Sequence, residues 1–295
     1  MIKRTIEISS DAAHVTVQHR QLTLQRNGTT IGTTPCEDVG VVLVDHPGTT
    51  YTHAALASLV ESEAVVVICG RDHLPAGVLL PLANNSQIVS RVNSQINASK
   101  PLQKRLWQQI VQAKILGQAA NLDPESPKRH KLTALAKTVR SGDPTNIEAQ
   151  AARHYWSDFI DDRSFRRDAN AAGLNALLNY GYAVMRAATA RSLVAAGLVT
   201  AIGLHHINNR NSFCLADDMM EPLRPLVDDR ARTLFQDGCT TLNQEAKAGL
   251  LSLLGEVVVL GEDRGPLMVN LHRMTASLVR CFQGSQKRLE IPHAC

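Results

Sequence analysis

The chain has 295 residues, of which 44% are hydrophobic and 20% are charged, and its formal net charge is +4. These fractions are typical of folded globular proteins and exclude an intrinsically disordered chain. The N-terminal stretch MIKRTIEISS has no apolar core of signal-peptide length, and no run reaches the roughly 18 apolar residues that a membrane-spanning helix needs. We therefore expect a soluble, cytoplasmic protein without a membrane partner, divided into two domains.

Six cysteines are scattered along the chain without a CxxC pair or the paired spacing of a structural zinc site. This distribution predicts reduced thiols in a cytosol. The cysteines are Cys36, Cys69, Cys214, Cys239, Cys281 and Cys295.

The first part of the chain shows the alternation of apolar and polar residues that is typical of β-strands. Every second residue is apolar in HVTVQH and in QLTLQR, and the pair Asn27 and Gly28 that follows favours a tight hairpin turn. Two continuous apolar runs come next, VGVVLVD and AVVVIC, with the helix-like THAALASLVES between them and a last strand near GVLLPL. The pattern predicts a small β domain with one helix over residues 1–84, which we expect to form a homodimer.

Helical periodicity replaces strand alternation after about Asn84, so we place a domain boundary near residues 82 to 95. The remainder is expected to be a larger, all-helical domain over residues 85–295. The predicted fold class is therefore α+β.

Two long helices stand out in this second part. The stretch SKPLQKRLWQQIVQAKILGQAANL predicts a helix that begins at Ser99 or Lys100, ahead of Pro101. The stretch NAAGLNALLNYGYAVMRAATARSLVAAGL predicts a helix of about seven turns that ends at Gly197.

Positive charges gather in three runs, and the sequence pI is about 8.8. Such runs are either solvated surface or a phosphate-binding surface on which Lys and Arg displace counterions from a nucleic acid. The runs are SPKRHK (126–131), RSFRR (163–167) and QKR (286–288).

A carboxylate stands on an unexpected side of a third helix. In SGDPTNIEAQAARHYWSDFI, Asp143 can cap the helix and Pro144 suits its first position. Glu148 lies along the side where the apolar residues of this helix should pack, and an unpaired charge there costs several kcal/mol. The apolar stripe consists of Ile147, Ala151, Tyr155 and Phe159.

Two kinds of partner are open for Glu148. One is a salt bridge, to Arg153 or to an arginine of another helix. The other is a metal ion that His206 and Glu221 hold as well.

The stretch GLHHINNRNSFCLADDMMEPLRP gathers two histidines, two aspartates and a glutamate. On a helix Asp217 and Asp218 would lie beside Glu221, where like charges repel and a cation would relieve them. One of His205 and His206 either makes a backbone hydrogen bond in a turn or the core, or binds a metal. One imidazole with two carboxylates and no nearby thiolate favours Mg²⁺ or Mn²⁺.

Polar residues at helical spacing also mark NALLNYGYA. Asn175, Asn179 and Tyr182 are either packed and paired within the core, or orient metal ligands or a phosphate. Gly181 is expected to let another helix approach closely.

Five segments together resemble one protein family, and the similarity runs in order along nearly the whole chain. The family is the CRISPR-associated spacer-acquisition integrase, or universal CRISPR endonuclease, in its type II-like form beside a single-protein effector nuclease. The segments are EDVGVVLVDHP, HLPAGVLLPL, SGDPTNIEAQAARHYW, NALLNYGYAVMRA and GLHHINNRNSFCLADDMMEPLRPLVD.

The resemblance implies an N-terminal β domain and a helical domain with a Glu/His/acidic metal site. Its residues fall on Glu148 in NIEAQAAR, His206 in GLHH and Glu221 in MMEPLRP. Met219 and Leu223 stand where the family usually has Leu and Phe, apolar exchanges that leave the ligands in place.

The function that the resemblance implies is a metal-dependent DNA integrase and endonuclease, which inserts short foreign duplexes into a CRISPR array. A bound Mg²⁺ or Mn²⁺ would activate a 3′-hydroxyl for attack on a phosphodiester. The expected partners are double-stranded DNA, both spacer duplex and repeat, a second copy of the chain, a small companion protein of ferredoxin-like fold, and the type II effector nuclease.

Two other functions stay open at this point. One is a nuclease or branched-DNA repair enzyme that does not integrate into an array, and the other is a DNA-binding scaffold without catalysis. Further residues are expected to contact DNA or support the ligands: His205, Asn179, Tyr182, Arg153, Arg210 and Asp218.

Overall fold

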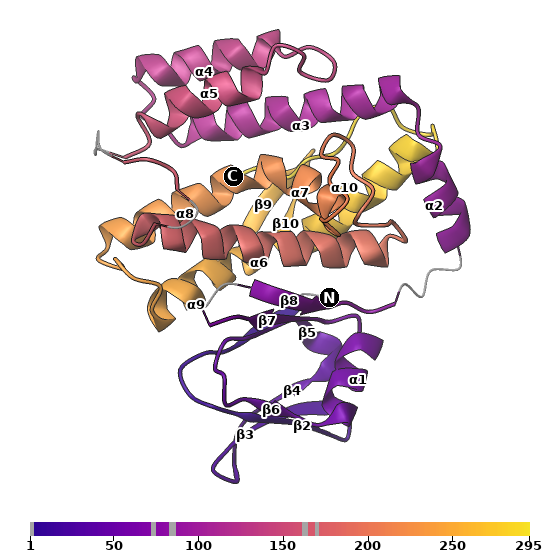
Figure 1. The fold of residues 1–295 in the computed structure, drawn as a ribbon, viewed down its shortest axis with the longest axis vertical. Coiled ribbons are helices and arrows are strands. Elements are labelled where there is room, and N and C mark those ends of the chain that lie inside the picture. Colours follow the sequence, from indigo (N-terminus) through magenta and orange to yellow (C-terminus); the bar gives the residue numbers. More distant parts are fainter. Residues whose placement is uncertain (1–2, 72–74, 83–86, 161–164, 169–170) are drawn as a thin grey trace.

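The computed structural model describes residues 3–71, 75–82, 87–160, 165–168 and 171–295. Strands fill the lower part of Figure 1, and layers of helices lie above them. The strands are β1 (Arg4–Ile8), β2 (His14–Gln18), β3 (Gln21–Arg26), β4 (Thr29–Pro35), β5 (Val39–Val44), β6 (Thr50–Tyr51), β7 (Val65–Cys69), β8 (Pro75–Leu79), β9 (Val257–Leu260) and β10 (Asp263–Pro266).

The helices begin inside the strand-rich part and dominate the rest of the chain. They are α1 (His53–Glu61), α2 (Ile88–Ile96), α3 (Lys100–Ala120), α4 (Pro127–Thr138), α5 (Ile147–Trp156), α6 (Leu174–Ala195), α7 (Cys214–Met220), α8 (Arg224–Gln236), α9 (Gln244–Ser252) and α10 (Leu267–Phe282), with short 3₁₀ turns η1 (Cys36–Asp38), η2 (Glu221–Leu223) and η3 (Leu253–Gly255).

The N-terminal part contains two four-stranded sheets, ordered β1-β5-β7-β8 and β4-β3-β2-β6. The predicted hairpin joins β3 to β4, and its turn residues Asn27 and Gly28 have φ angles of 49° and 78°, the left-handed conformation that such turns require. The predicted single helix of this part is α1, which begins where the Thr52 side chain accepts a hydrogen bond from the Ala55 amide.

Strand β5 is buried along its whole length because both faces of its sheet are covered. Val41 and Leu43 point into the large core that the helices form, whereas Val42 and Val44 point into a smaller core beneath. This two-sided burial explains the continuous apolar run in the sequence. One sheet is therefore shared between the strand-rich and the helical parts of the molecule.

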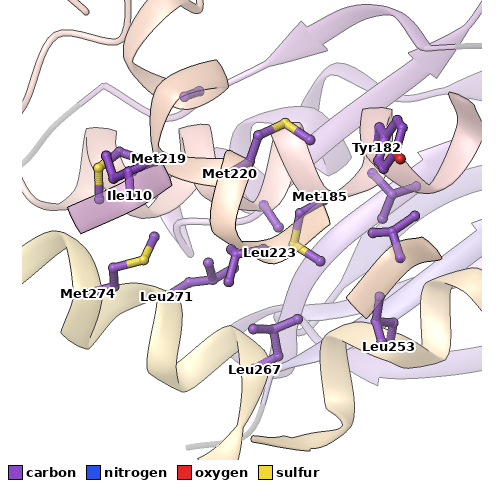
Figure 2. Packing of buried hydrophobic residues seen from close by; sticks show 14 of the residues in the cluster. Ile110, Tyr182, Met185, Met219, Met220, Leu223, Leu253, Leu267, Leu271 and Met274 are labelled. Carbon is purple, nitrogen blue, oxygen red and sulfur yellow. The ribbon is translucent and has the colours of Figure 1, made fainter. Parts of the chain in front are cut away.

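Helix α6 lies between strands β7 and β8 on one side and helices α7 and α8 on the other, as Figure 1 shows, and 16 of its 22 residues are buried. The predicted close approach of another helix at Gly181 is confirmed, because a Cβ there would collide with Val227 of α8. The helix ends as predicted, with Gly197 at φ 71° just beyond it. Figure 2 shows the adjoining core, where Met185 of α6 lies near Leu223 and Met220.

Two details of the predicted fold are wrong. The C-terminal part is mainly helical but not all-helical, because β9 and β10 pair as an antiparallel hairpin. Helix α5 begins at Ile147, not at Pro144, and its N-cap is Asn146. The predicted boundary near residues 82 to 95 begins after the end of β8, runs into α2 and includes residues 83–86, which lie outside the described residues, so the division into domains stays a prediction.

All six cysteines are free thiols. Among the described residues, none of the helices is both long and apolar enough to cross a bilayer.

Candidate functional site

Two carboxylates from distant segments meet at one lysine. Lys114 of α3 places its Nζ 2.5 Å from Oε1 of Glu148 on α5 and 2.6 Å from Oε2 of Glu221 in η2. Its side chain is only 12% exposed. The structure thus brings together two of the three predicted catalytic residues, and the cation between them is a lysine that sequence reasoning did not identify.

Glu148 owes its position to the way in which α5 begins. Asp143, at φ 46°, accepts hydrogen bonds from the amides of Ile147 (2.8 Å) and Glu148 (3.0 Å). Asn146 caps the next amide, that of Ala149. Asn146 is therefore the N-cap residue in place of the predicted Asp143, but the Asp143 carboxylate binds the first two helical N–H groups from the preceding turn and fixes Glu148 in the first helical turn.

Glu221 is held on both carboxylate oxygens. While Oε2 accepts from Lys114, Oε1 accepts from Nε of Arg224 at 2.9 Å. Burial alone would raise the pKa of Glu221, but the charges of Lys114 and Arg224 lower it below its usual value. The same two glutamates raise the pKa of Lys114 against the opposing effect of burial. The shifts in pKa therefore favour the charged forms of both Glu221 and Lys114.

His206 lies in a loop that one buried carboxylate organises. Asp218 is fully buried and accepts three successive backbone N–H groups, those of Leu204 (2.6 Å), His205 (3.0 Å) and His206 (3.2 Å). It also accepts Nδ1–H of His206 at 2.6 Å. A side chain at Gly203 would collide with the backbone oxygen of His206, so this tight turn requires glycine.

The hydrogen bond to Asp218 is the main reason that the pKa of His206 is raised. Burial opposes this increase, and the charges of Glu221 and Glu148 add to it. His206 is therefore within the electrostatic field of the carboxylate pair. Its neighbour His205 instead stacks on Trp107, with ring centroids 4.2 Å apart and planes at 1°.

The acidic cluster that the sequence suggested is divided among three separate partners. Asp217 pairs with Arg186 at 2.8 Å, and Asp218 serves the loop that precedes α7. Only Glu221 faces Glu148. The expectation that one cation relieves all three carboxylates is therefore wrong. Asp217 and Glu221 pair with separate side-chain cations, and Asp218 accepts hydrogen bonds from backbone amides.

The polar residues of α6 hold an arginine and an aspartate. Asn175 accepts from Arg167 at 2.9 Å, and Asn179 accepts from the other terminal nitrogen of the same guanidinium. The Tyr182 hydroxyl donates to the fully buried Asp228. Of the two interpretations for this group, the structure shows paired polar contacts, and Arg167 is a partner that the sequence did not reveal.

Arginines surround the ring of Tyr182. The guanidinium carbon of Arg224 lies 4.4 Å from the ring centroid, and that of Arg167 lies 5.4 Å from it. Arg224 also binds Glu221. The Tyr182 ring and Arg224 therefore connect Arg167 to the site of the carboxylate pair. Arg163 and Ser164 of the same basic run lie outside the described residues.

Two predicted residues are not brought to this place. Arg153 is exposed on α5 and is not the partner of Glu148; of the two kinds of partner left open, the structure shows a salt bridge, and it runs to Lys114 of another helix. Arg210 is exposed in the loop after His206, where its backbone N–H donates to Asn208.

The donor set can be compared with what a divalent cation needs. Among the described residues, no group of three His, Cys, Asp or Glu side chains is close enough together to hold a metal ion. Glu148 and Glu221 nevertheless direct one oxygen each at a single positive charge, as ligands of Mg²⁺ or Mn²⁺ do. Asp218 fixes Nδ1 of His206, the outer hydrogen bond that metal-binding histidines commonly make. Two carboxylates therefore fit a shared cation, and the charges of both raise the pKa of His206.

Residues 6–255 match the family model described as "CRISPR associated protein Cas1". A protein named "CRISPR-associated endonuclease Cas1" from Neisseria meningitidis serogroup C (strain 8013) is 42% identical over 226 residues, which cover 76% of this chain and 73% of that protein. "CRISPR-associated endonuclease Cas1 2" from Pyrobaculum aerophilum is 27% identical over 84% of this chain and 89% of its own length.

Solved structures show the same fold at lower sequence identity. The structure titled "Casposase bound to integration product" superposes with a TM-score of 0.80 at 18% identity and covers 98% of this chain and 92% of its own. A CAS1 protein from Thermotoga maritima gives 0.74 at 18% identity, with 95% and 97% covered.

Proposed function

Because the chain belongs to the family of CRISPR-associated Cas1 proteins, we propose that it is a metal-dependent DNA integrase and endonuclease that inserts short foreign duplexes into a CRISPR array. The observation that carries the proposal is the convergence of Glu148 and Glu221 on one cation, with His206 in their field. A relative named as an endonuclease and a fold neighbour titled as bound to an integration product agree with phosphodiester chemistry.

In this proposal Glu148, Glu221 and His206 hold a Mg²⁺ or Mn²⁺ ion. Bound there, the ion would activate the 3′-hydroxyl of the incoming strand and neutralise charge on the phosphate under attack. The 3′-oxygen of the cut repeat strand leaves, and water in place of the hydroxyl gives hydrolysis. Asp218 and Arg224 are the groups that fix the orientation of His206 and Glu221.

Arg167 is proposed to contact a DNA phosphate beside this site. Asn175 and Asn179 hold its guanidinium, and none of the described carboxylates forms a salt bridge with it. Such a contact contributes about one neutralised phosphate to the salt dependence of binding. Arg167→Ala should therefore weaken binding of any duplex and reduce the slope of log binding constant against log salt concentration by about 1. The matched control is Arg166→Ala, which removes the exposed neighbouring arginine. An unchanged slope in Arg167→Ala would remove Arg167 from the DNA surface.

The partners proposed from the family are the spacer duplex and the repeat, a second copy of the chain, a small companion of ferredoxin-like fold, and the effector nuclease of a type II system. A solved structure similar to this chain is titled "Cas6-RT-Cas1--Cas2 complex", with a TM-score of 0.75 at 20% identity over 97% of this chain and 35% of its own. The proposed place of action is the cytoplasm.

One assay separates integration from the alternatives. Supercoiled plasmid with a leader and a repeat is mixed with fluorescent duplex and Mn²⁺, and the label that joins the plasmid is measured. We expect incorporation by the unchanged chain and its loss in Glu148→Gln, Glu221→Gln and His206→Ala. Cleavage without incorporation would indicate a nuclease or repair enzyme, and binding without either would indicate a scaffold.

Two controls accompany these variants. Glu262→Gln makes the same chemical change at an exposed position beyond β9 and should integrate normally. His205→Ala removes the ring that stacks on Trp107 and should be milder than His206→Ala. A Glu148→Gln protein that still integrates DNA would defeat the metal-site proposal.

A further inference from the structure

Lys114 is neither a solvent-exposed lysine nor an apolar core residue: it is mostly buried, and it pairs with two carboxylates. It lies on the buried side of α3, four residues after Ile110, which is fully buried. Its ammonium donates to one oxygen of Glu148 and one of Glu221 at 2.5 Å and 2.6 Å. A charge on this face of a helix is stable only because both carboxylates satisfy it.

The oxygens that Lys114 uses are those that a divalent cation would need. Oε1 of Glu221 is already bonded to Arg224 at 2.9 Å, so Oε2 is the oxygen of that carboxylate left for a cation shared with Glu148. Oε2 is the atom that Lys114 binds. A metal ion that bridged these two oxygens would lie close to the ammonium that already bridges them, where the two positive charges repel strongly.

The charges of the cluster are balanced as the structure has them. Glu148 and Glu221 contribute two negative charges, and Lys114 and Arg224 contribute two positive ones. A divalent ion that joined all four would leave two positive charges in excess in a buried place. A divalent ion that displaced the ammonium would meet the same two carboxylates without that crowding.

We propose that Lys114 is a built-in counter-ion of the carboxylate pair, which a divalent cation must displace from Glu148 and Glu221 before the site can fill. Lys114 is thus a positioning residue: it holds the two carboxylates together without metal and raises the metal concentration that the site requires. This inference rests on the proposed function, because it takes these carboxylates as the metal ligands.

The test measures metal binding without DNA or catalysis. Lys114→Met keeps an unbranched, flexible side chain, shorter by one heavy atom, and removes its charge. Titration calorimetry of the full chain with Mn²⁺ should give a dissociation constant for Lys114→Met that is lower than that of the unchanged chain by roughly tenfold or more. The reason is that two charge-assisted hydrogen bonds no longer have to be broken. In EDTA the melting temperature of Lys114→Met should be lower than that of the unchanged chain. Saturating Mn²⁺ should raise the melting temperature of Lys114→Met by more than it raises that of the unchanged chain.

Matched variants keep the result specific. Lys104→Met makes the same change at an exposed position of α3 and should alter neither quantity. If Lys114→Met does not fold in EDTA, Lys114→Gln keeps one hydrogen-bond donor without the charge and should also tighten Mn²⁺ binding. Unchanged or weaker Mn²⁺ affinity in the neutral variants would overturn the displacement role.

The outcomes also separate this inference from the proposed function. If Mn²⁺ binding requires Glu148 and Glu221 but ignores Lys114, the metal site stands and only the counter-ion role fails. If the unchanged chain and Glu148→Gln give the same Mn²⁺ isotherm, the proposed metal site fails, and the role of Lys114 fails with it.

Discussion

Asp218 and Glu221 show how three residues of separation in the chain can divide two acidic side chains between unrelated tasks. Asp218 is fully buried and spends its carboxylate on the loop that carries His206, while Glu221 faces Glu148 across Lys114. Asp218 lies in α7, whereas Glu221 begins the following turn η2, so the two side chains meet different neighbours. An acidic motif in a sequence therefore specifies charge but not its use.

Asp218→Asn tests the use that the structure gives this residue. The amide offers one acceptor oxygen in place of two, so at least one buried N–H group of the loop loses its partner. We expect the variant to lose roughly 1–3 kcal/mol of unfolding free energy, measured by urea denaturation, and to lose integration because His206 is no longer oriented. Asp217→Asn, whose partner Arg186 is partly exposed, should cost less. Equal stability losses in the two variants would contradict the assigned role.

The sequence contained a usable signal for Lys114, but not for its partners. Lys114 follows Ile110 by four residues and Trp107 by seven, and both of these are buried, so periodicity alone places a charge on the apolar face of α3. Its partners are 34 and 107 residues away in the chain. Which carboxylates it meets depends on how α3, α5 and η2 pack, and local periodicity carries no information on that packing.

At the scale of elements, three helices are joined through one buried carboxylate. Asp228 of α8 accepts from the hydroxyl of Tyr155 on α5 at 3.0 Å and from that of Tyr182 on α6. Burial raises the pKa of Asp228 to about 6, even though both tyrosines and Arg224 favour its charged form. The junction of α5, α6 and α8 at Asp228 is therefore sensitive to protonation of this carboxylate.

The pKa of Asp228 predicts a definite pH dependence. Its folded value, about 6, lies above its ordinary value of 3.8, so the folded chain binds the proton more tightly than the unfolded chain does. The resulting stability is fully present below about pH 4 and is lost as the pH rises through about 6, by about 3 kcal/mol in total. In Asp228→Asn this dependence should be absent.

Urea denaturation of both proteins between pH 4.5 and 8 measures it, because other titrating groups cancel in the difference. Relative to Asp228→Asn, the unchanged chain should lose stability toward neutral pH. A difference that is constant over this range, or that changes in the opposite direction, would show that Asp228 is ionised throughout.

The elements that the sequence predicted best are those with a long periodic pattern and a clear cap. The helix expected from Ser99 or Lys100 begins there, with the Ser99 hydroxyl accepting from the Leu102 amide. The hairpin of β9 and β10 was missed because its strands are four residues each and lie between helical segments. So short an apolar run does not distinguish a strand from a buried turn of helix.

At the scale of the whole molecule, buried polar contacts join the strand-rich part to the helices. Lys247 of α9 pairs with Asp45 beyond β5, and their side chains are 7% and 1% exposed. Arg191 of α6 donates to the backbone oxygen of Glu63 at 2.6 Å. With the shared sheet, these contacts fix the position of the candidate site relative to the β part. A dimer formed through the β part would therefore also fix the positions of two such sites relative to each other.

The homodimer is predicted to form through this β part. Strand β4 is an edge strand of its sheet, and Ile31 on it is 50% exposed. Exposed edge strands with apolar side chains are ready to pair with a second chain. We expect the full chain to sediment as a dimer and Ile31→Asp to dissociate it, since the interface would have to bury a charge without a partner.

The control places the same charge on the helical part. Ile96 of α2 is 56% exposed, and Ile96→Asp should leave the dimer intact if the interface lies in the β part. Both variants change an exposed side chain, so neither is expected to unfold the chain, and circular dichroism verifies this before sedimentation. Dissociation by Ile96→Asp with Ile31→Asp still dimeric would move the interface to the helices, and the spacing of the two candidate sites would then be set by α2 instead of by the sheet edge.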